Sequence, residues 1–499
     1  MRRVMVAGGE IRLGFVGRGK MPGTRRDIAS LGNGWSAPML WYARAVGALL
    51  AQPIGTRTSW TAMAAVHGCD LPGWQAAGLI PSGGLPAIKP EWNQCQHGNW
   101  FFLPWHRGYI ASFEAIIAST ILHLGGPAGW TLPYWNYLDA TAVNARSLPQ
   151  VFTLPTLPDG APNPLARWPR QYSVLAPHPP LINSDISLAA TAVHQYTSAP
   201  GARGFGGAPN AAGAVESNPH NLVHIMIGGV TGTVGYMSDP QYAALDPIFW
   251  LHHCNVDRLW AAWLTNSANT QEHGASWRAG PAVPPFILPD PSGNLVRFTP
   301  GQTLPGNPLA PIYDNLTKGT GQTGSAVRAE GDDIVPASLS DEPPKPANLL
   351  GASAPRSVIA PGGAVTADLP LDGGTIPAGL EEQRLYLNIE NVRGEAPSGM
   401  LDIRIGVKPG VTEDHGQQEY VDSLPLFGLK LASDADGPHG GNGLSFVIDI
   451  TDTVHLLTRS ADIGPGDLEV SIVQPDPGEG AQEISVGRIS IYSQPADPA

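Results

Sequence analysis

The sequence predicts two structurally different parts, a helical region followed by an antiparallel β-sandwich or barrel. At 499 residues, the chain is longer than a single typical hydrophobic core supports. Apolar residues recur at helical spacing before residue 320, whereas they alternate with polar residues after residue 357. Charge changes in the same region, because residues 351–499 hold 8 Lys and Arg against 22 Asp and Glu while residues 1–350 are nearly balanced. These three observations place a domain boundary near residue 350.

Helical spacing of apolar residues predicts the helices of the first part. They span residues 37–52, 104–123, about 186–197, 216–227 and 246–265. In the second of them, Ile110, Ile117 and Ile121 fall on one face. Pro104 suits its first turn because the N–H that proline lacks has no helical partner there. Residues 145–215 are rich in Pro, Gly and Ala, which predicts a mostly irregular segment around the short third helix.

Residues 321–356 contain few large apolar side chains and several prolines, so we expect a linker there. Beyond it, five stretches alternate apolar with polar residues as strands do: RLYLNIENV (384–392), MLDIRIGV (400–407), LSFVIDI (444–450), LEVSIV (468–473) and ISVGRISIYS (484–493). Turn clusters such as DADGPHGGNG separate them and favour an antiparallel arrangement. The expected organisation is a first domain at residues 1–320, the linker, and a β-rich domain at residues 357–499.

Composition limits the classes of function. The net charge of −13 repels nucleic acid, so no nucleic-acid partner is expected. No run of 18 apolar residues occurs, and we therefore expect no membrane-spanning helix. Residues 1–20 start basic but lack a sustained apolar core, so we expect no secretory signal and a cytoplasmic location. Cys69, Cys95 and Cys254 are too few for a disulfide framework. The oligomeric state stays open, with a homo-oligomer among the outcomes considered.

Histidines are concentrated in a few short segments. Of the 14 in the chain, seven lie in or near two groups: His67, His97, His106, His220, His224, His252 and His253. The four-residue spacing of His220 and His224 places two imidazoles on one helix face and suits metal binding. His97 and His106 flank the aromatic stretch GNWFFLPW, where an imidazole is poorly solvated and needs a strong partner. A hydrogen-bonded core histidine is the commoner explanation for any one of them, but less so for six together.

Ligation by imidazoles alone suits zinc, copper, iron or nickel rather than magnesium or calcium. Catalytic zinc sites use three protein ligands and an open position, and two such triads would fit a dinuclear centre. His252 and His253 point about 100° apart on a helix, so they do not readily serve the same small site. Asp257 follows His253 by one helical turn, and we expect its carboxylate to orient a ligating imidazole. The spacing does not select one metal.

Four segments resemble the tyrosinase family. HGNWFFLPWHRGYIASFE (97–114) looks like the family's first copper motif, and DPIFWLHHCNVDRLW (246–260) closely resembles the second. GWTLPYWNY (129–137) and ESNPHNLVH (216–224) are similar to two shorter segments, although the former ends in Asn-Tyr where Asp-Trp is usual. The resemblance covers about residues 37–320. The family also includes catechol oxidases and the oxygen-carrying domains of molluscan haemocyanins.

The resemblance implies a type-3 dicopper centre in a four-helix bundle, with three histidines on each copper ion. Matched onto this chain, the first copper takes His67, His97 and His106, and the second takes His220, His224 and His253. In the family pattern the last ligand lies four residues before an Asp, here Asp257, and this selects His253 over His252. Cys95 precedes His97 by two residues, and the resemblance implies a thioether between its sulfur and that imidazole.

The implied activity is copper-dependent oxidation of small phenols with O₂ as co-substrate. Monophenols are hydroxylated to o-diphenols, and o-diphenols are oxidised to o-quinones. In similar tyrosinases a Glu and an Asn hold a water that deprotonates the monophenol, and they match Glu216 and Asn221 here. A carboxylate at a helix N-terminus that interacts with the helix dipole is the alternative explanation for Glu216. The alternative functions are a catechol oxidase without monophenolase activity, a haemocyanin-like oxygen-binding protein and a zinc hydrolase.

The β-rich domain resembles, in position and character, the shielding domains of latent polyphenol oxidases and of haemocyanin. Those domains cover the copper site and insert one bulky apolar side chain. The corresponding candidates here are Leu426 and Phe427, in the apolar turn DSLPLFGLKL (422–431). A role in oligomerisation or in copper delivery is the alternative.

Overall fold

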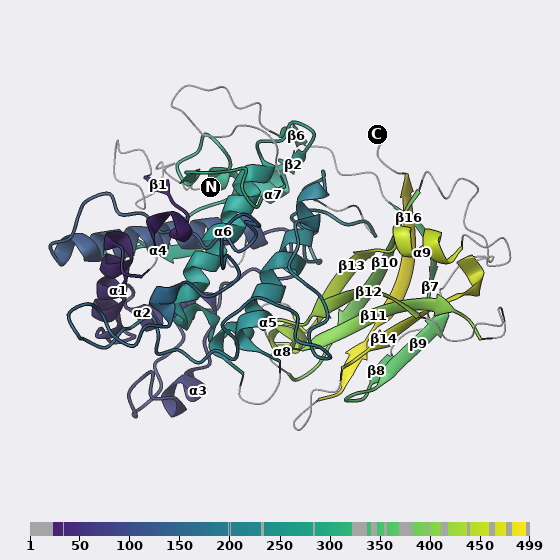
Figure 1. Cartoon of the computed structure of the whole chain (residues 1–499), viewed down its shortest axis with the longest axis horizontal. Helices are drawn as coiled ribbons and strands as arrows, with labels where there is room; N and C mark the ends of the chain where they lie inside the picture. The colour runs from purple at the N-terminus through teal and green to yellow at the C-terminus, as the bar shows by residue number, and fades with distance from the viewer. Residues whose placement is uncertain are drawn as a thin grey trace, which may run out of the picture.

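A computed structural model shows a helical part and a β-rich part lying next to each other (Figure 1). It describes residues 23–32, 34–197, 199, 201–230, 234–282, 285–321, 337–340, 347–353, 357–368, 383–396, 399–409, 411, 418–436, 440–458, 465–475 and 482–495. The N-terminal segment 1–20 and most of the expected linker lie outside these residues. The predicted fold class, a helical region followed by an antiparallel β domain, is confirmed.

The helical part contains α1 (Ala37–Leu50), α2 (Trp60–His67), α3 (Leu71–Ala76), α4 (Phe102–His123), α5 (Leu222–Gly228), α6 (Pro247–Trp263) and α7 (Ala275–Ala279). A π-helical segment, η4 (Glu216–Asn221), runs directly into α5. Three short strand pairs join its loops: β1 (Thr24–Arg25) with β5 (Ile312–Tyr313), β2 (Thr270–Glu272) with β6 (Ser338–Ser340), and β3 (Ile287–Pro289) with β4 (Leu295–Arg297). Helices α1, α4 and α6 match predicted stretches to within a few residues.

Several helical segments differ from the sequence analysis, since the short helices α3 and α7 were not predicted. Helix α2 was not predicted, because all eight of its side chains are buried and no amphipathic period marks it. The short helix expected near residues 186–197 is a single 3₁₀ turn at Ala189–Ala192. The Pro and Gly residues around this turn favour irregular backbone over a longer helix.

Helices α4 and α6 pack through large aromatic side chains. Phe113 stacks on Trp250 with ring centroids 3.5 Å apart, and the Tyr109 ring lies 4.7 Å from the same indole. Helix α6 begins after Asp246, whose carboxylate accepts the Ile248 N–H as an N-cap. Interdigitated aromatic rings allow little sliding of one helix along the other. Histidines carried on these two helices therefore have defined positions.

Asp257 anchors α6 to the rest of the helical part. Its carboxylate accepts hydrogen bonds from Arg107 on α4 and from Tyr313, and it pairs with Arg25 at 3.1 Å. The expectation that this carboxylate orients the imidazole of His253 is wrong, because it is directed at these partners and Nδ1 of His253 has no hydrogen-bond partner. Removing one partner of a buried ion pair typically destabilises a protein by about 3–5 kcal/mol.

The β-rich part is a sandwich of two antiparallel sheets, with strand orders β13-β10-β16-β7 and β12-β11-β14-β9. Its strands are β7 (Asn348–Ala352), β8 (Ser357–Ile359), β9 (Ala364–Asp368), β10 (Gln383–Val392), β11 (Met400–Val407), β12 (Gln418–Pro425), β13 (Leu444–Asp449), β14 (Leu468–Val473), β15 (Ile484–Val486) and β16 (Arg488–Pro495), and its short helices are α8 (Leu429–Ser433) and α9 (Thr451–Leu457). Apolar side chains from both sheets form one core between them. All five predicted strand stretches form strands, and the last divides at Gly487 into β15 and β16.

Strands β7, β8, β9 and β12 were not predicted from the sequence. The first of them lies within the stretch expected to be a linker, yet it pairs with β16 at the edge of a sheet. The sandwich therefore begins before residue 357. Three of these strands have five residues or fewer, and so few alternations do not distinguish a strand from a loop.

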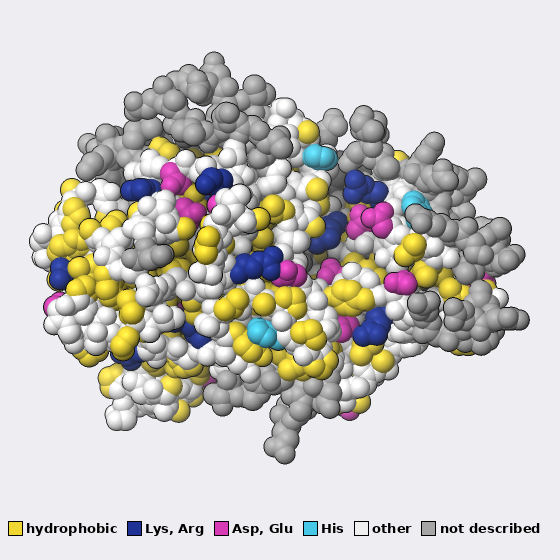
Figure 2. All heavy atoms as spheres, viewed as in Figure 1, with side chains coloured by type: hydrophobic (Ala, Val, Ile, Leu, Met, Phe, Trp, Pro, Cys, Tyr) yellow, Lys and Arg dark blue, Asp and Glu magenta, His cyan; other side chains and the backbone are white. Residues whose placement is uncertain are grey.

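Two further features of the described residues are the apolar character of the helices and the distribution of surface charge. Among the described helices, none combines the length and the apolar character that crossing a membrane requires. On the face shown in Figure 2, Lys and Arg side chains are scattered and several lie beside Asp or Glu.

Candidate metal centre

Two groups of buried side chains with metal-binding atoms lie within the helical part. The first group is His67, Cys95, His97 and His106, and the second is His220, His224, His252 and His253. Within each group the nitrogen and sulfur atoms that could bind a metal lie within 4.8 Å of one another. The structure therefore brings together all six histidines predicted as ligands. They come from α2, α4, η4, α5, α6 and the loop before α4.

Two imidazoles of the first group are oriented by backbone carbonyls. Nδ1 of His67, at the end of α2, lies 2.8 Å from the carbonyl oxygen of Pro240. Nδ1 of His106, near the start of α4, lies 2.8 Å from the carbonyl oxygen of Phe102. A carbonyl oxygen only accepts hydrogen bonds, so Nδ1 carries the proton in both rings and Nε2 keeps its lone pair. This is the tautomer that binds a metal through Nε2.

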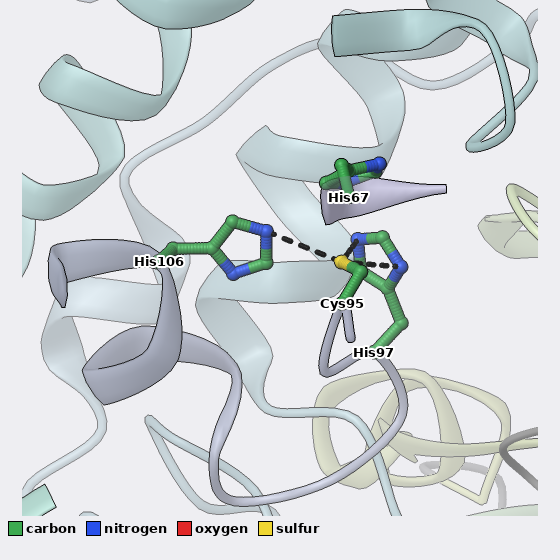
Figure 3. Close-up of side chains that lie close together, drawn as sticks. All are labelled: His67, Cys95, His97 and His106. Carbon is green, nitrogen blue, oxygen red and sulfur yellow. Dashed lines mark hydrogen bonds between the residues drawn. The ribbon is translucent and has the colours of Figure 1, made fainter. Parts of the chain in front are cut away.

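Figure 3 shows the sulfur of Cys95 between the rings of His97 and His106. Sγ lies 3.4 Å from Nδ1 and 3.5 Å from Nε2 of His97, and 3.4 Å from Nε2 of His106. Burial raises the pKa of this thiol well above its ordinary value, so the thiol is neutral when no cation is near. The sulfur is thus in contact with the ring to which a thioether is expected, and the bond itself stays a prediction.

The second group places three Nε2 atoms face to face. Nε2 of His253 lies 3.3 Å from Nε2 of His220 and 3.3 Å from Nε2 of His224. Nδ1 of His224 lies 2.7 Å from the carbonyl oxygen of Met237, and Nδ1 of His220 lies 2.8 Å from Oδ1 of Asn221. Both Nδ1 atoms therefore donate, and both Nε2 atoms point their lone pairs toward His253.

This arrangement suits a cation between the rings. Burial lowers the pKa of His220, His224 and His253 well below the ordinary value, and the neighbouring imidazoles lower it further. The rings are therefore neutral, and a proton on Nε2 of His253 could be donated to only one of the two lone pairs of His220 and His224 at a time, whereas a metal ion could bind all three nitrogens. Neutral imidazoles suit copper, zinc, iron or nickel, so the donor set fits the copper expected from the resemblance.

The two groups adjoin each other, as a dinuclear centre requires. The rings of His106 and His253 are nearly parallel, with centroids 4.5 Å apart and an interplanar angle of 17°. The rings of His97 and His220 are 5.6 Å apart. One metal ion in each group would therefore be close to the other. Both groups are buried, so a substrate must reach them through the surrounding loops.

His252 belongs to the second group by distance, but its ring is held differently. Its Nδ1 lies 3.0 Å from the hydroxyl of Tyr137, and its ring runs nearly parallel to that of His220 at 5.3 Å. Tyr137 is one of the two residues that depart from the usual family pattern, and its hydroxyl supplies this contact. The three mutually facing Nε2 atoms belong to His220, His224 and His253, which agrees with the choice of His253 as the ligand.

Glu216 and Asn221 lie beside the histidines. Oε1 of Glu216 accepts the Gly98 N–H at 2.7 Å, next to His97, and its Oε2 is buried without a hydrogen-bond partner. Burial raises the pKa of Glu216 to about 8, although the Gly98 N–H lowers it. Asn221 accepts the Nδ1 proton of His220. An unsatisfied carboxylate oxygen in a buried site is available to accept a proton from a ligand.

The raised pKa of Glu216 predicts how the stability of the metal-free protein depends on pH. The folded state holds this proton more tightly than the unfolded chain does, so the group's contribution is fully present below pH 4.5 and is lost as pH rises through about 8. Between pH 7 and 8.5, where histidines are mostly neutral, the free energy of unfolding should fall by about 1 kcal/mol for this reason. Glu216→Gln keeps an acceptor for Gly98 but does not ionise, so its decrease should be smaller by that amount. Urea unfolding at both pH values measures the difference, and equal decreases would contradict the raised pKa.

The β domain covers the histidines with one aromatic side chain. The ring of Phe427 stacks on His224 with centroids 4.2 Å apart at 19°, and it lies 5.3 Å from His97 and 5.9 Å from His220. Phe427 packs in the core of the helical part, whereas its neighbour Leu426 packs in the core of the sandwich. Of the two candidates from the sequence, only Phe427 therefore contacts the centre.

Sequence reasoning missed the carbonyls that orient the imidazoles. Pro240 and Met237 come from residues 228–245, where the sequence analysis names no site residue; residues 231–233 of this stretch lie outside the described residues. Any residue supplies a carbonyl, so no residue type marks such a position. Tyr137 was noted only as a departure from the family pattern, and that departure was the available signal.

Comparisons with known proteins agree with this geometry. The family model "Common central domain of tyrosinase" matches residues 57–266, and a domain of unknown function matches residues 365–494. A tyrosinase from Hahella sp. is 31% identical over 490 residues, which cover 91% of this chain and 96% of that protein. A chloroplastic polyphenol oxidase from Vicia faba is 29% identical and matches 55% of this chain but only 45% of its own length.

The solved structures agree in fold. A latent aurone synthase (polyphenol oxidase) superimposes with a TM-score of 0.59 at 18% identity, covering 98% of this chain and 93% of its own. The whole-length match to the Hahella tyrosinase, together with two adjoining histidine groups that fit a type-3 dicopper site, shows that the chain belongs to the tyrosinase and polyphenol oxidase family of copper-dependent phenol oxidases.

Proposed function

We propose that this phenol oxidase acts on both monophenols and o-diphenols, and that six histidines hold its two copper ions. His67, His97 and His106 would bind the first ion, and His220, His224 and His253 the second. The observation that supports this assignment best is that the neutral Nε2 atoms of His220 and His224 each lie 3.3 Å from Nε2 of His253. The thioether between Cys95 and His97 is part of the proposal, because it would restrain one ligand ring.

When bound, the copper ions supply the redox chemistry by which O₂ oxidises a phenol. The chain's own residues orient the substrate and remove its proton. We assign proton removal to Oε2 of Glu216, directly or through a water that Asn221 helps to hold, because this oxygen is buried without a partner. Nearby dications favour the ionised carboxylate and lower its pKa from the metal-free value, which leaves it able to accept a proton near neutral pH.

The test compares tyramine with dopamine on copper-loaded protein, for the wild type and for Glu216→Gln. We expect two copper ions per chain in both proteins and quinone formation from both substrates in the wild type. The substitution should lower the rate on tyramine by about 100-fold or more, which is typical for a lost general base, and affect dopamine much less. Equal losses on both substrates would contradict the proton-removal role. Oxidation of dopamine alone by the wild type would indicate a catechol oxidase instead.

We also propose that Phe427 keeps the enzyme latent by occupying the place of the substrate ring. Its ring stacks on His224 as a phenol ring could, and it comes from a different domain from the histidines. Substrate can bind only to molecules in which Phe427 has moved away. The apparent affinity for substrate is then the intrinsic affinity multiplied by the fraction of such molecules. Small phenols would therefore compete with Phe427 for the same surface.

A further inference from the structure

Asn218 holds the segment that carries Glu216 and His220. Its backbone leaves the helical conformation, with φ −144° and ψ 120°, in the middle of η4. Its side-chain Oδ1 accepts the N–H of Ser187 at 3.1 Å, and its Nδ2 donates to the carbonyl oxygen of Asp185 at 3.0 Å. The amide side chain of Asn218 thus accepts one backbone hydrogen bond from a second segment and donates another to it, as the backbone of a neighbouring strand would.

The second segment, residues 183–187, is here called the strap. It is also bonded to the β domain. Nδ2 of Asn183 donates to Oδ2 of Asp402 at 2.7 Å. The hydroxyl of Ser184 lies 2.6 Å from that of Tyr420 and accepts the backbone N–H of Ser423 at 3.0 Å. The strap therefore lies between the β domain and η4, with hydrogen bonds to each.

Several features make the strap a firm connection. Ser184 is 7% exposed and Ile186 is 3% exposed, so these alternate residues of the strap are buried. Between them, the exposed side chain of Asp185 pairs with Arg146 at 2.6 Å, a contact to the helical part that contributes little because water screens it. The hydrogen bond from the Ser423 N–H to Ser184 is buried, and hydrogen bonds shielded from water contribute more than exposed ones do. A displacement of the strap is therefore transmitted to the side chain of Asn218.

The local sequence gives η4 little other support at this point. Pro219 follows Asn218 directly and has no N–H to donate, so the turn between Glu216 and His220 lacks one of its internal hydrogen bonds. The side chain of Asn218 supplies an external substitute. Because three peptide units or fewer separate it from Glu216 and His220, a change of its position moves both.

We propose that Asn218 is a positioning residue for Glu216 and His220, and that the strap couples the docking of the β domain to the shape of the second copper site. The inference rests on the proposed roles of these two residues. It gives the β domain a second action besides the plug, because a docked domain also holds the ligand segment in place through the strap.

Hydrogen–deuterium exchange of the copper-free, full-length protein tests the positioning role without any activity measurement. In Asn218→Ala, amides of residues 216–224 should exchange about tenfold faster than in the wild type, since two hydrogen bonds are lost. The matched control is Asn163→Ala, because Asn163 also binds backbone groups on both sides, at Val151, Leu154 and Leu165, away from the centre. The control should leave exchange at 216–224 unchanged. Unchanged exchange in Asn218→Ala, or an equal rise in the control, would overturn the proposal.

A second pair of variants tests the coupling. Asn183→Ala removes the hydrogen bond to Asp402 and should raise exchange at residues 216–224, by less than Asn218→Ala does. Asn388→Ala also removes one hydrogen bond between the domains, from Nδ2 to the carbonyl oxygen of Gly201 at 2.9 Å, but it does not touch the strap. It should have no effect at 216–224. If Asn183→Ala has none either, or both variants act alike, the strap does not couple the β domain to η4.

Copper retention then separates this inference from the proposed ligand set. After dialysis against a chelator that leaves two copper ions in the wild type, Asn218→Ala should retain close to one per chain while Asn163→Ala retains two. Faster exchange at 216–224 with full copper retention would mean that Asn218 shapes η4 without affecting the second copper site, which overturns the coupling and leaves the ligand assignment standing. Faster exchange with loss of one copper supports both.

Discussion

His253→Ala is expected to bind one copper ion per chain instead of two and to lose nearly all phenol oxidation. Nε2 of His253 lies 3.3 Å from Nε2 of both His220 and His224, so its removal leaves the second site with two imidazoles. Replacing a residue that only supports a metal ligand typically lowers affinity or activity by about 10–100-fold, and loss of the ligand itself should exceed that range. Elemental analysis for copper, combined with the rate on dopamine, measures both effects.

His252→Ala is the matched control, because it removes the same side chain from the adjacent and equally buried position. Its Nδ1 is engaged by the hydroxyl of Tyr137 and its ring lies against His220, so we expect a supporting role. The variant should keep two copper ions and lose activity by less than about 100-fold. Loss of one copper from His252→Ala with two retained in His253→Ala would reverse the ligand assignment.

Phe427→Ala is expected to raise the activity of the full-length enzyme on dopamine by at least about tenfold. The phenyl ring stacks on His224 and lies edge-on to His97, so substrate and Phe427 cannot occupy that place together. Truncating a buried Phe to Ala typically lowers the stability of its packing by about 3–5 kcal/mol. Each 1.4 kcal/mol shifts an equilibrium about tenfold, so a modest share of this loss is enough to raise the unplugged fraction tenfold. The apparent kcat/KM of the intact chain measures the change.

Phe427→Leu is the control for this prediction, because leucine keeps most of the apolar bulk over the imidazoles. It should remain close to the wild type in activity, and both variants should bind two copper ions, since Phe427 has no atom that binds a metal. Equal activation in the two variants would mean that weaker domain docking, and not the vacated space, releases the enzyme. No activation in either would contradict the plug.

Helices and strands with a long, regular pattern of apolar residues were predicted correctly from the sequence. The period of Ile110, Ile117 and Ile121 predicted α4, and all three side chains are fully buried. Strands β10 and β11 alternate apolar with polar residues over most of their length and were recognised, whereas β12 has eight residues but its sequence QEYVDSLP does not alternate. Helix α2 and strand β7 were missed, because a fully buried helix and a short edge strand leave no clear period in the chain.

The sequence by itself determined the chemistry of the centre: which histidines occur at metal-binding spacing, and that their motifs are those of a dicopper phenol oxidase. Tertiary structure decided how those side chains are used. It directed Asp257 to the arginines instead of His253, chose Phe427 over Leu426 as the covering side chain, and brought the strap against Asn218. Ligand type and spacing are local properties of the chain, whereas orientation, cover and support depend on contacts between residues more than a hundred positions apart or on backbone groups that every residue has.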